Sequence, residues 1–398
     1  MAFAGIICEY NPFHTGHAAH IAATRERLGG DTDVICVMSG NFVQRGEPAV
    51  MKKHARAEAA VRCGADLVLE NPVPWATASA ERFALGAVSV LNGTGLPVTL
   101  SFGSECGDAE KLERAANALL TDEAHRMVRE ALGDGLSYAA ARQKAADALL
   151  GSDADVLKNP NDILGIEYMK AIGRLGADMD VLAVKRVNTE HDGDEACGMA
   201  PASLIREKLL AGESADGFVP ECAREILARE TGAGRAPVTI KNAEGLILYR
   251  LRTMSDDDYA LLPDGSEGLW MRLRDAGYAA KSYEEVLEKT KTKRYAMSRI
   301  RRMVLAAFLG TTAEMSSMLP PYIRVLAFNE RGQEILKKMK KTATLPIVTK
   351  PASAKKLPPE ARKIFEFEAR TTDIYELMYP DNVCGGGGEW TLGPVTVK

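Results

Sequence analysis

The sequence predicts an α/β protein in which a parallel sheet is followed by a mainly α-helical second half. Over the first half of the chain, short β-rich runs alternate with long amphipathic stretches. Such alternation is typical of a parallel sheet covered by helices. After about residue 206 the alternation stops and helical patterns dominate. At 398 residues the chain is long enough for two domains with separate cores.

The first half provides the candidate strands. The first spans residues 3–8 and runs into a turn at Asn11-Pro12, after which a helical pattern begins at His17. The other strands are expected at residues 34–38, 67–69, 98–102 and 181–184, with a long helical insertion at about residues 108–150. Because ligands bind beyond the carboxyl ends of parallel strands, the segments that follow these strands are the expected place for a site.

Two turn-rich stretches mark the expected domain boundary. Residues 212–217 and 232–237 are rich in glycine, and we place the boundary between them. The first domain is then residues 1–225 and the second, mainly helical domain is residues 226–398.

The composition excludes several classes of protein. No apolar run approaches the roughly 18 residues that a membrane-spanning helix requires, so no membrane partner is expected. The first residues are typical of a core strand rather than of a signal peptide. The seven cysteines are scattered and form no C-x-x-C pair. This pattern indicates a protein of the reducing cytoplasm without structural zinc or disulfides.

Charge is unevenly distributed along the chain. Residues 281–302 contain eight Lys or Arg and three Glu, a local balance of +5 in a chain whose net charge is −4. Such a run is ordinary for a solvated helix face. It is also typical of a surface that binds the phosphate backbone of a nucleic acid. Charge alone leaves both interpretations open.

His14, Gly16 and His17 are the most informative residues of the chain. They follow the first strand and begin a helix, where unpaired N–H groups and the positive end of the helix dipole favour phosphate. Two imidazoles at this point can donate hydrogen bonds as charge moves onto a departing pyrophosphate. A zinc site made by His14, His17 and His20 is the alternative, but no Cys pair or Glu stands at ligand spacing. The motif therefore predicts transfer of an AMP group, without a metal site.

A resemblance to known enzymes begins at residues 9–17, Glu9-Tyr10-Asn11-Pro12-Phe13-His14-Thr15-Gly16-His17. Its last four residues resemble the motif of the H-x-G-H nucleotidyltransferases. The full stretch is similar to that of the bacterial tRNA(Met) cytidine acetate ligases. The similarity continues through residues 38–48, 101–105, 160–168 and 320–326, so that it covers most of the chain. The resemblance implies a Rossmann-like HUP nucleotidyltransferase domain, residues 1–225, followed by a tRNA-binding domain, residues 226–398. It also implies an enzyme that makes acetyl-AMP from ATP and acetate, then acetylates N4 of the wobble cytidine of elongator tRNA(Met).

The resemblance implies site residues as well. His14 and His17 are the expected catalytic residues. The resemblance assigns to ATP binding Ile7, Cys8, Glu9, Tyr10, Asn11, Pro12, Phe13, His14, Thr15, Gly16, His17, Ala18, Ala19, His20, Gly103, Asn161, Arg186, Ser203 and Arg206. Every one of these precedes residue 225, so the first domain is expected to bind ATP on its own.

Some of these positions have structural alternatives. Arg186 fits a surface ion pair at a strand end, and Asn161 fits a helix cap as well as a nucleotide contact. Gly103 fits a glycine that only a turn requires. Ser203 and Arg206 match a Ser-rich signature whose other positions are replaced here by Ala200-Pro201-Ala202, and a helix cap with an exposed arginine explains them equally.

Polar and basic residues outside these motifs are candidates for the other substrates. Asn41, Gln44 and Arg45 follow the second strand and are expected in the acetate pocket or against tRNA, with a plain surface loop as the alternative. Combined with an adenylating site that needs a macromolecular acceptor, the basic run becomes an expected tRNA surface. The expected tRNA contacts are Lys53, Arg56, Lys293, Arg294, Arg299, Arg301 and Arg302.

The chemistry explains why ATP is required. Acetate is a poor electrophile and the exocyclic amine of cytosine a poor nucleophile, so the carboxylate must be activated first, and the enzyme must hold it in line with the α-phosphate. Mg²⁺ is expected with ATP, although no carboxylate cluster indicates a dedicated site. The expected partners are ATP, acetate and elongator tRNA(Met), and no DNA. Two alternatives remain: a small-molecule adenylyltransferase and a non-catalytic RNA-binding protein.

Overall fold

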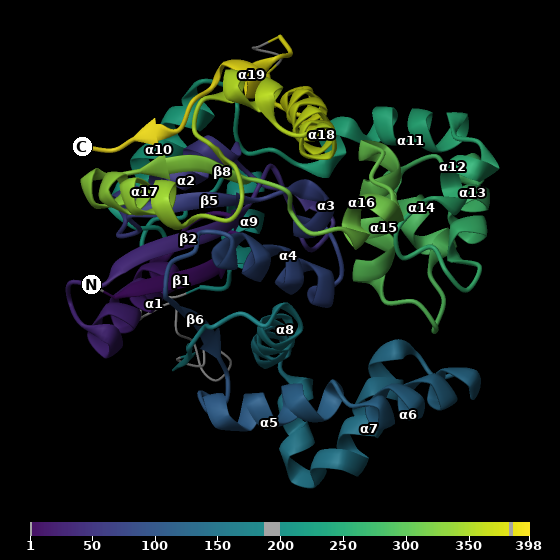
Figure 1. The fold of residues 1–398 in the computed structure, drawn as a ribbon. Helices are drawn as coiled ribbons and strands as arrows, with labels where there is room; N and C mark the ends of the chain where they lie inside the picture. Colours follow the sequence, from purple (N-terminus) through teal and green to yellow (C-terminus); the bar gives the residue numbers. More distant parts are fainter. Residues whose placement is uncertain (1, 187–199, 382–384) are drawn as a thin grey trace.

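A mostly parallel sheet forms the centre of the molecule (Figure 1), whose computed structural model describes residues 2–186, 200–381 and 385–398. The strand order is β10-β8-β5-β2-β1-β6-β7, and β9 pairs with β8. The strands of the first half are β1 (Phe3–Cys8), β2 (Asp33–Ser39), β5 (Leu67–Asn71), β6 (Val98–Ser104) and β7 (Val181–Lys185). All of these pairings are parallel, which confirms the predicted parallel sheet.

Helices cover both faces of the sheet because its strands are apolar on both sides. Phe3 and Ile7 of β1 pack in the core that α4 (Ala80–Asn92), α8 (Pro160–Leu175) and α17 (Glu330–Thr342) share. Ala4 and Ile6 point the other way, into the core that includes residues of α1 (Thr15–Leu28), α2 (Lys53–Arg62), α9 (Ala202–Leu210) and α10 (Glu221–Gly232). The two-residue alternation along β1 therefore fills two cores.

The predicted helical insertion is confirmed. It consists of α5 (Ala109–Leu119), α6 (Asp122–Gly133) and α7 (Tyr138–Leu150), followed by η1 (Gly151–Lys158). Figure 1 shows these helices below the sheet, connected through β6 and α8. Within the described ranges, no helix is both long and apolar enough to cross a membrane.

Helices of the second half build another core, to which Phe42 and Val73 of the first half also belong. It contains η3 (Ile240–Ala243), α11 (Glu244–Thr253), α12 (Asp256–Ala260), α13 (Leu269–Ala279), α14 (Tyr283–Thr290), α15 (Met297–Leu309) and α16 (Ala313–Ser317). In Figure 1 these helices lie together on the right, with α15 facing the sheet. The apolar side of α15 lies at the centre of this core. The predicted helical character of the region after residue 226 is confirmed for this part.

The structure differs from the expected division at residue 225, because later residues complete the sheet. β8 (Ile323–Phe328) pairs antiparallel with β5, and β9 (Ile347–Val348) and β10 (Val395–Thr396) pair with β8. α18 (Pro359–Glu376) and α19 (Gly388–Thr391) then pack against each other above the sheet (Figure 1). The sequence analysis missed β8 because a single strand preceded by Pro320-Pro321 gives no alternation with helices.

A buried cluster of charges joins the two halves of the chain. Lys53 Nζ on α2 lies 2.8 Å from Glu70 and 2.7 Å from Glu389, which comes from α19. Arg324 on β8 lies 3.2 Å from the same Glu389. Glu368 on α18 accepts the backbone N–H of Val73 at the start of α3 (Val73–Ala76). Because these side chains are about 1–2% exposed and paired, removing one partner leaves another charge buried alone.

The cysteine prediction was wrong in one respect. Cys63, which follows α2, and Cys222, in the first turn of α10, form a disulfide. The two cysteines are 159 residues apart in sequence, so no short-range spacing of cysteines could predict the disulfide. The disulfide connects two helices that pack on the same face of the sheet.

Candidate active site

His14 and His17 lie at the N-terminus of α1 and cap it reciprocally. His14 Nδ1 accepts the backbone N–H of Gly16 at 3.1 Å, and His17 Nδ1 accepts the backbone N–H of His14 at 3.2 Å. A ring nitrogen that accepts a hydrogen bond carries no proton, so in a neutral imidazole the proton is on Nε2. Both rings are thereby held in the tautomer whose Nε2–H is available to a ligand.

The electrostatics keep these imidazoles neutral. Burial and the charges of Arg186 and Arg206 lower the pKa of His14 to about 4. Burial, His14, His20 and Arg186 lower the pKa of His17 well below its usual value. The two rings stack with centroids 3.7 Å apart, which fits uncharged rings better than two cations. At neutral pH both side chains are therefore neutral hydrogen-bond donors.

His20 lies one turn further along α1. Its Nε2 lies 3.1 Å from Ser101 Oγ on β6, so the ring connects the helix to the sheet. Burial and Arg186 lower its pKa to about 4 as well. Within the described residues, no group of three or more His, Cys, Asp or Glu side chains is arranged to hold a metal ion.

The predicted contacts on the β6–β7 side come together. Arg186 directly follows β7, and a Cβ on Gly103 would stand 3.3 Å from Arg186 Cγ. The glycine thus leaves room for the arginine side chain. Asn161, in the first turn of α8, donates from Nδ2 to Glu105 Oε1 at 2.6 Å, while Asp162 N–H donates to Glu105 Oε2 at 2.9 Å. Glu105, which the sequence analysis did not single out as a site residue, therefore orients Asn161 and satisfies the helix N-terminus.

α9 brings a second arginine, after Arg186, to the motif. Arg206 Nη1 donates to the backbone oxygen of Asn11 at 3.0 Å, and its charge lowers the pKa of His14. Ser203 lies in the first turn of this helix, but Pro201 is the N-cap and no side chain caps it. The structural alternative for Ser203, a cap, is therefore wrong. Residues 187–199, which precede α9, lie outside the described residues.

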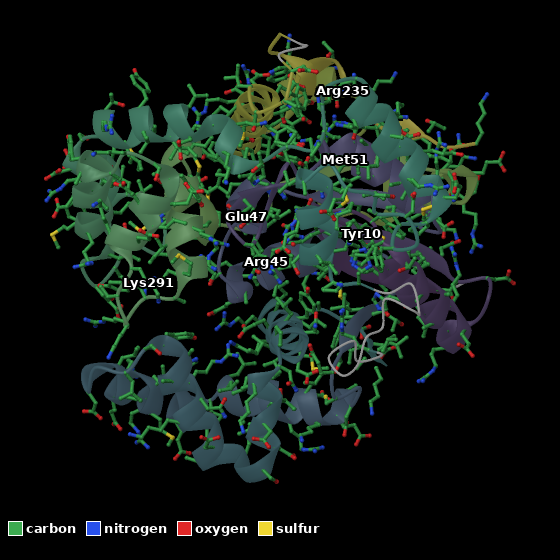
Figure 2. The ribbon with its side chains drawn as sticks, turned by 180° about the vertical axis from the view of Figure 1, so that it is seen from behind. Tyr10, Arg45, Glu47, Met51, Arg235 and Lys291 are labelled. Carbon is green, nitrogen blue, oxygen red and sulfur yellow. A yellow bond between two sulfur atoms is a disulfide. The ribbon has the colours of Figure 1, made fainter. Side chains whose placement is uncertain are left out.

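The hairpin of β3 (Phe42–Val43) and β4 (Glu47–Pro48) lies between the end of β1 and α15 and contacts both. Gln44 N–H donates to Glu9 Oε1 at 2.8 Å, and Arg301 of α15 lies 2.9 Å from Glu47. Gly46 has a φ of +79°, and a Cβ there would stand 2.6 Å from the backbone of Arg301. Only glycine fits this contact. Figure 2 shows Arg45 and Glu47 between Tyr10, which follows Glu9, and Lys291 at the end of the second-half helices.

The three polar candidates of this loop have different surroundings. Asn41 is 2% exposed, and its amide donates to Thr372 Oγ1 at 3.2 Å and accepts Lys53 N–H at 2.8 Å. Gln44 is half-buried and holds Glu9 through its backbone. Arg45 is exposed and makes no hydrogen bond or ion pair within the described ranges. Of the three, Arg45 is the one whose side chain is available to a large ligand.

Lys53 and Arg56 are buried, which contradicts their predicted contact with tRNA. Both side chains are 0% exposed. Lys53 pairs with Glu70 and Glu389; burial alone would lower its pKa, but these carboxylates raise it. Arg56 donates to backbone carbonyls, including those of Met51 and Ser39 at 3.0 Å each. Their positions along α2 gave no sign of this burial, because the partners come from distant segments.

The basic run contains both paired and free side chains. Arg299 donates to the backbone oxygen of Asp264 at 2.8 Å, and Arg302 lies 3.2 Å from the Asp264 carboxylate. Arg294 lies 3.5 Å from Glu267 and remains 46% exposed. Lys293 is exposed and has no ion pair among the described residues. Arg299 and Arg302 therefore hold the turn before α13, whereas Lys293 and Arg294 face solvent.

Comparison with known proteins gives matches over the whole length. The family model described as HIGH Nucleotidyl Transferase matches residues 1–387. A protein of Acetivibrio thermocellus named tRNA(Met) cytidine acetate ligase is 36% identical over 95% of each chain. A protein of the same name from Thermotoga maritima is 38% identical over 98% of this chain and 99% of its own. The crystal structure of Thermotoga maritima TmcAL bound with alpha-thio ATP is similar over 100% of both chains, with a TM-score of 0.92 and 36% identity.

Proposed function

Because the chain belongs to the HIGH nucleotidyl transferase family and, within it, to the tRNA(Met) cytidine acetate ligases, we propose that it acetylates N4 of the wobble cytidine of elongator tRNA(Met). The overall reaction consumes ATP and acetate and releases AMP and diphosphate. One observation carries the proposal for this chain itself: two neutral imidazoles stand at a helix N-terminus, and their Nε2–H groups make no hydrogen bond among the described residues.

The first half-reaction joins acetate to AMP. Acetate attacks the α-phosphate in line, and diphosphate leaves. His14 and His17 donate from Nε2 to phosphate oxygens, and because neither is charged beforehand, their contribution comes from orientation. The residues Ile7 to His20 surround the phosphates, while Gly103, Asn161 and Arg186 hold the nucleoside side. Ser203 and Arg206 contact the triphosphate from α9.

The second half-reaction needs a surface for tRNA. Arg45 is exposed and follows Gln44, whose backbone contacts Glu9 of the motif. Lys293 is exposed without an ion pair among the described residues, and Arg294 remains 46% exposed beside Glu267. Arg301, which is 40% exposed, adds a further cation beside Glu47. We assign these side chains to the RNA backbone, and Gln44 with the buried Asn41 to the shape of the acetate pocket. An enzyme that acts on tRNA is expected in the cytoplasm.

Mg²⁺ belongs to this proposal as the ion that accompanies ATP. The described residues provide no set of carboxylates for a dedicated metal site. The phosphates themselves would therefore hold the ion, and no step is assigned to it here.

An ATP–diphosphate exchange assay with the purified chain tests the proposal. Exchange that requires acetate is the expected result. Exchange that requires a phosphorylated cofactor precursor instead would indicate a small-molecule adenylyltransferase. Absence of exchange with any acid would indicate a non-catalytic RNA-binding protein.

A further inference from the structure

Transfer of the acetyl group to a cytosine amine requires a proton acceptor. N4 attacks the carbonyl carbon of acetyl-AMP, so a C–N bond forms. The bond between the carbonyl carbon and the phosphate oxygen breaks, and AMP leaves with the electron pair. The attacking nitrogen must lose one proton. A positioned base increases the rate of such a step by about 10²–10⁴-fold.

Glu9 has the geometry of such a base. It directly follows β1, five residues before His14, and is half-buried. Oε1 accepts the backbone N–H of Gln44 at 2.8 Å, which fixes the orientation of the carboxylate. Oε2 has no hydrogen-bond partner within the described ranges. It is also not fully buried. Solvent therefore reaches this second oxygen.

Glu9 also contacts the β3–β4 hairpin, which follows β2. Gly103 and Arg186 belong to β6 and β7, and the strand order β2-β1-β6-β7 puts them on one side of β1. The β3–β4 hairpin follows β2, on the other side. An in-line displacement separates acetate from the leaving diphosphate. Glu9 is the one carboxylate of the Glu9–His17 motif, and the hairpin on the β2 side holds it near the exposed Arg45.

Charged and titratable groups from four elements face Glu9. Arg45 comes from the hairpin, Arg56 from α2, Arg206 from α9 and Tyr168 from α8. Burial raises the pKa of Glu9, while the Gln44 N–H and the three arginines oppose that rise. A carboxylate with a raised pKa is a stronger base than one in water, and it remains ionised above that pKa.

We propose that Glu9 accepts the proton from N4 of the cytidine through Oε2 while acetyl-AMP is consumed. This inference rests on the proposed function and gives Glu9 a second role, in acetyl transfer, beside its place in the ATP-binding segment. Arg45, exposed beside Glu9, brings the RNA backbone to the same point. The hairpin thus orients the carboxylate of Glu9 and also carries the cation Arg45.

Single-turnover kinetics of the Glu9→Gln variant test this role. The full chain is loaded with ATP and labelled acetate, and acetyl-AMP formation and acetyl transfer to tRNA are timed separately. Because Glu9 also belongs to the ATP-binding set, transfer is timed from acetyl-AMP that has already formed, and we expect this step to slow at least about 100-fold, by more than acetyl-AMP formation slows. Glu9→Asp, which keeps a carboxylate, should recover part of the loss. Glu207→Gln is the matched control, because it removes an exposed charge that also acts on Arg206.

The pH profile gives a second readout that a structural role would not move. The transfer rate of the unmodified chain should fall as the pH drops through the pKa of Glu9, and this acid limb should be absent in Glu9→Gln. Transfer as fast as in the unmodified chain, or equal losses in both steps, would overturn the inference. If the unmodified chain itself makes no acetyl-AMP, the proposed function fails instead, before any variant is compared.

Discussion

His14 and His17 carry their ring proton on Nε2 because backbone N–H groups at the start of their own helix occupy both Nδ1 atoms. The sequence predicted the two imidazoles, the glycine and the helix start. It did not predict the tautomer, which depends on a hydrogen bond within a single turn. A phosphate ligand meets donors that need no protonation, since the pKa of both rings lies below the usual value.

Replacing either histidine should slow acetyl-AMP formation by about 10²–10³-fold, as for the loss of one transition-state donor. His14→Asn is the most informative variant, because asparagine still caps a helix but has no Nε2–H. Acetate-dependent diphosphate exchange measures the effect, and His125→Ala on the exposed side of α6 is the control. Near-normal exchange in His14→Asn and His17→Ala would refute the assignment. So would a thermal midpoint low enough to explain the loss by unfolding.

Lys53 shows where residue-scale prediction failed. Its sequence position suggested a surface cation, yet its partner Glu389 lies more than three hundred residues later. Lys53→Met should lower the free energy of unfolding by about 3–5 kcal/mol, because Glu70 and Glu389 would remain buried without their cation. Lys144→Met, at an exposed position with no ion pair among the described residues, should change it by less than about 0.5 kcal/mol. Denaturant unfolding followed by circular dichroism checks both values, and equal stabilities would disprove the buried network.

The same network has a pH dependence. Burial alone would raise the pKa of Glu389, but Lys53 and Arg324 lower it to about 2. A carboxylate whose folded pKa is depressed contributes stability above its unfolded pKa and loses it as the pH falls toward the folded value. The contribution should therefore disappear between about pH 4.5 and pH 2, and Lys53→Met should weaken that dependence.

At the scale of elements, three of the strands that the sequence predicted, β1, β2 and β5, are buried on both faces. β1, β2 and β5 are apolar runs followed by turns, and their predicted bounds differ from the observed ones by at most two residues. β8 was missed although it is equally buried, because it carries Arg324 in its second position and follows two prolines. From sequence alone an arginine is expected at the surface, because the partners that allow its burial lie far away along the chain.

The basic run contains two sets of side chains, exposed cations and cations that hold a turn. Measuring tRNA affinity at several salt concentrations distinguishes the two sets. Lys293→Ala/Arg294→Ala should weaken tRNA binding and flatten the slope of log K against log[salt] by about 0.7–0.9 per lost phosphate contact. Arg299→Ala/Arg302→Ala should instead lower the thermal midpoint, because the Asp264 carboxylate would lose its partner. Filter binding at several salt concentrations measures the first effect.

An unchanged slope in Lys293→Ala/Arg294→Ala would contradict the assignment of this surface. The next candidate would then be residues 337–356, which contain seven lysines and no carboxylate. This segment was not among the predicted tRNA contacts. Lys340, Lys341, Lys350, Lys355 and Lys356 are exposed and have no ion pair among the described residues.

At the scale of the whole molecule, the two halves cannot be separated at residue 225. β8 extends the sheet beside β5, and α17 covers part of one face. The sequence placed every nucleotide motif before residue 225 and therefore suggested an independent first domain. Long-range pairing overrides that suggestion, because a motif marks chemistry and not the limits of a core.

A chain that ends at residue 225 should consequently fail to fold. It would expose the edge of β5 and leave Lys53 and Glu70 without Glu389 and Arg324. We expect aggregation or a non-cooperative thermal transition, measured against the full chain by calorimetry. A cooperative transition together with ATP binding by the truncated chain would show that the later strands are dispensable.

Acetylation of tRNA by the purified full-length chain tests the central claim most directly. The chain is incubated with ATP, ¹³C-acetate and elongator tRNA(Met), and the nucleosides are then analysed by mass spectrometry. The account predicts labelled N4-acetylcytidine at the wobble position, with one AMP released per acetyl group. The same tRNA with uridine at that position should remain unlabelled. Unlabelled tRNA(Met), or label accompanied by ADP instead of AMP, would contradict the account.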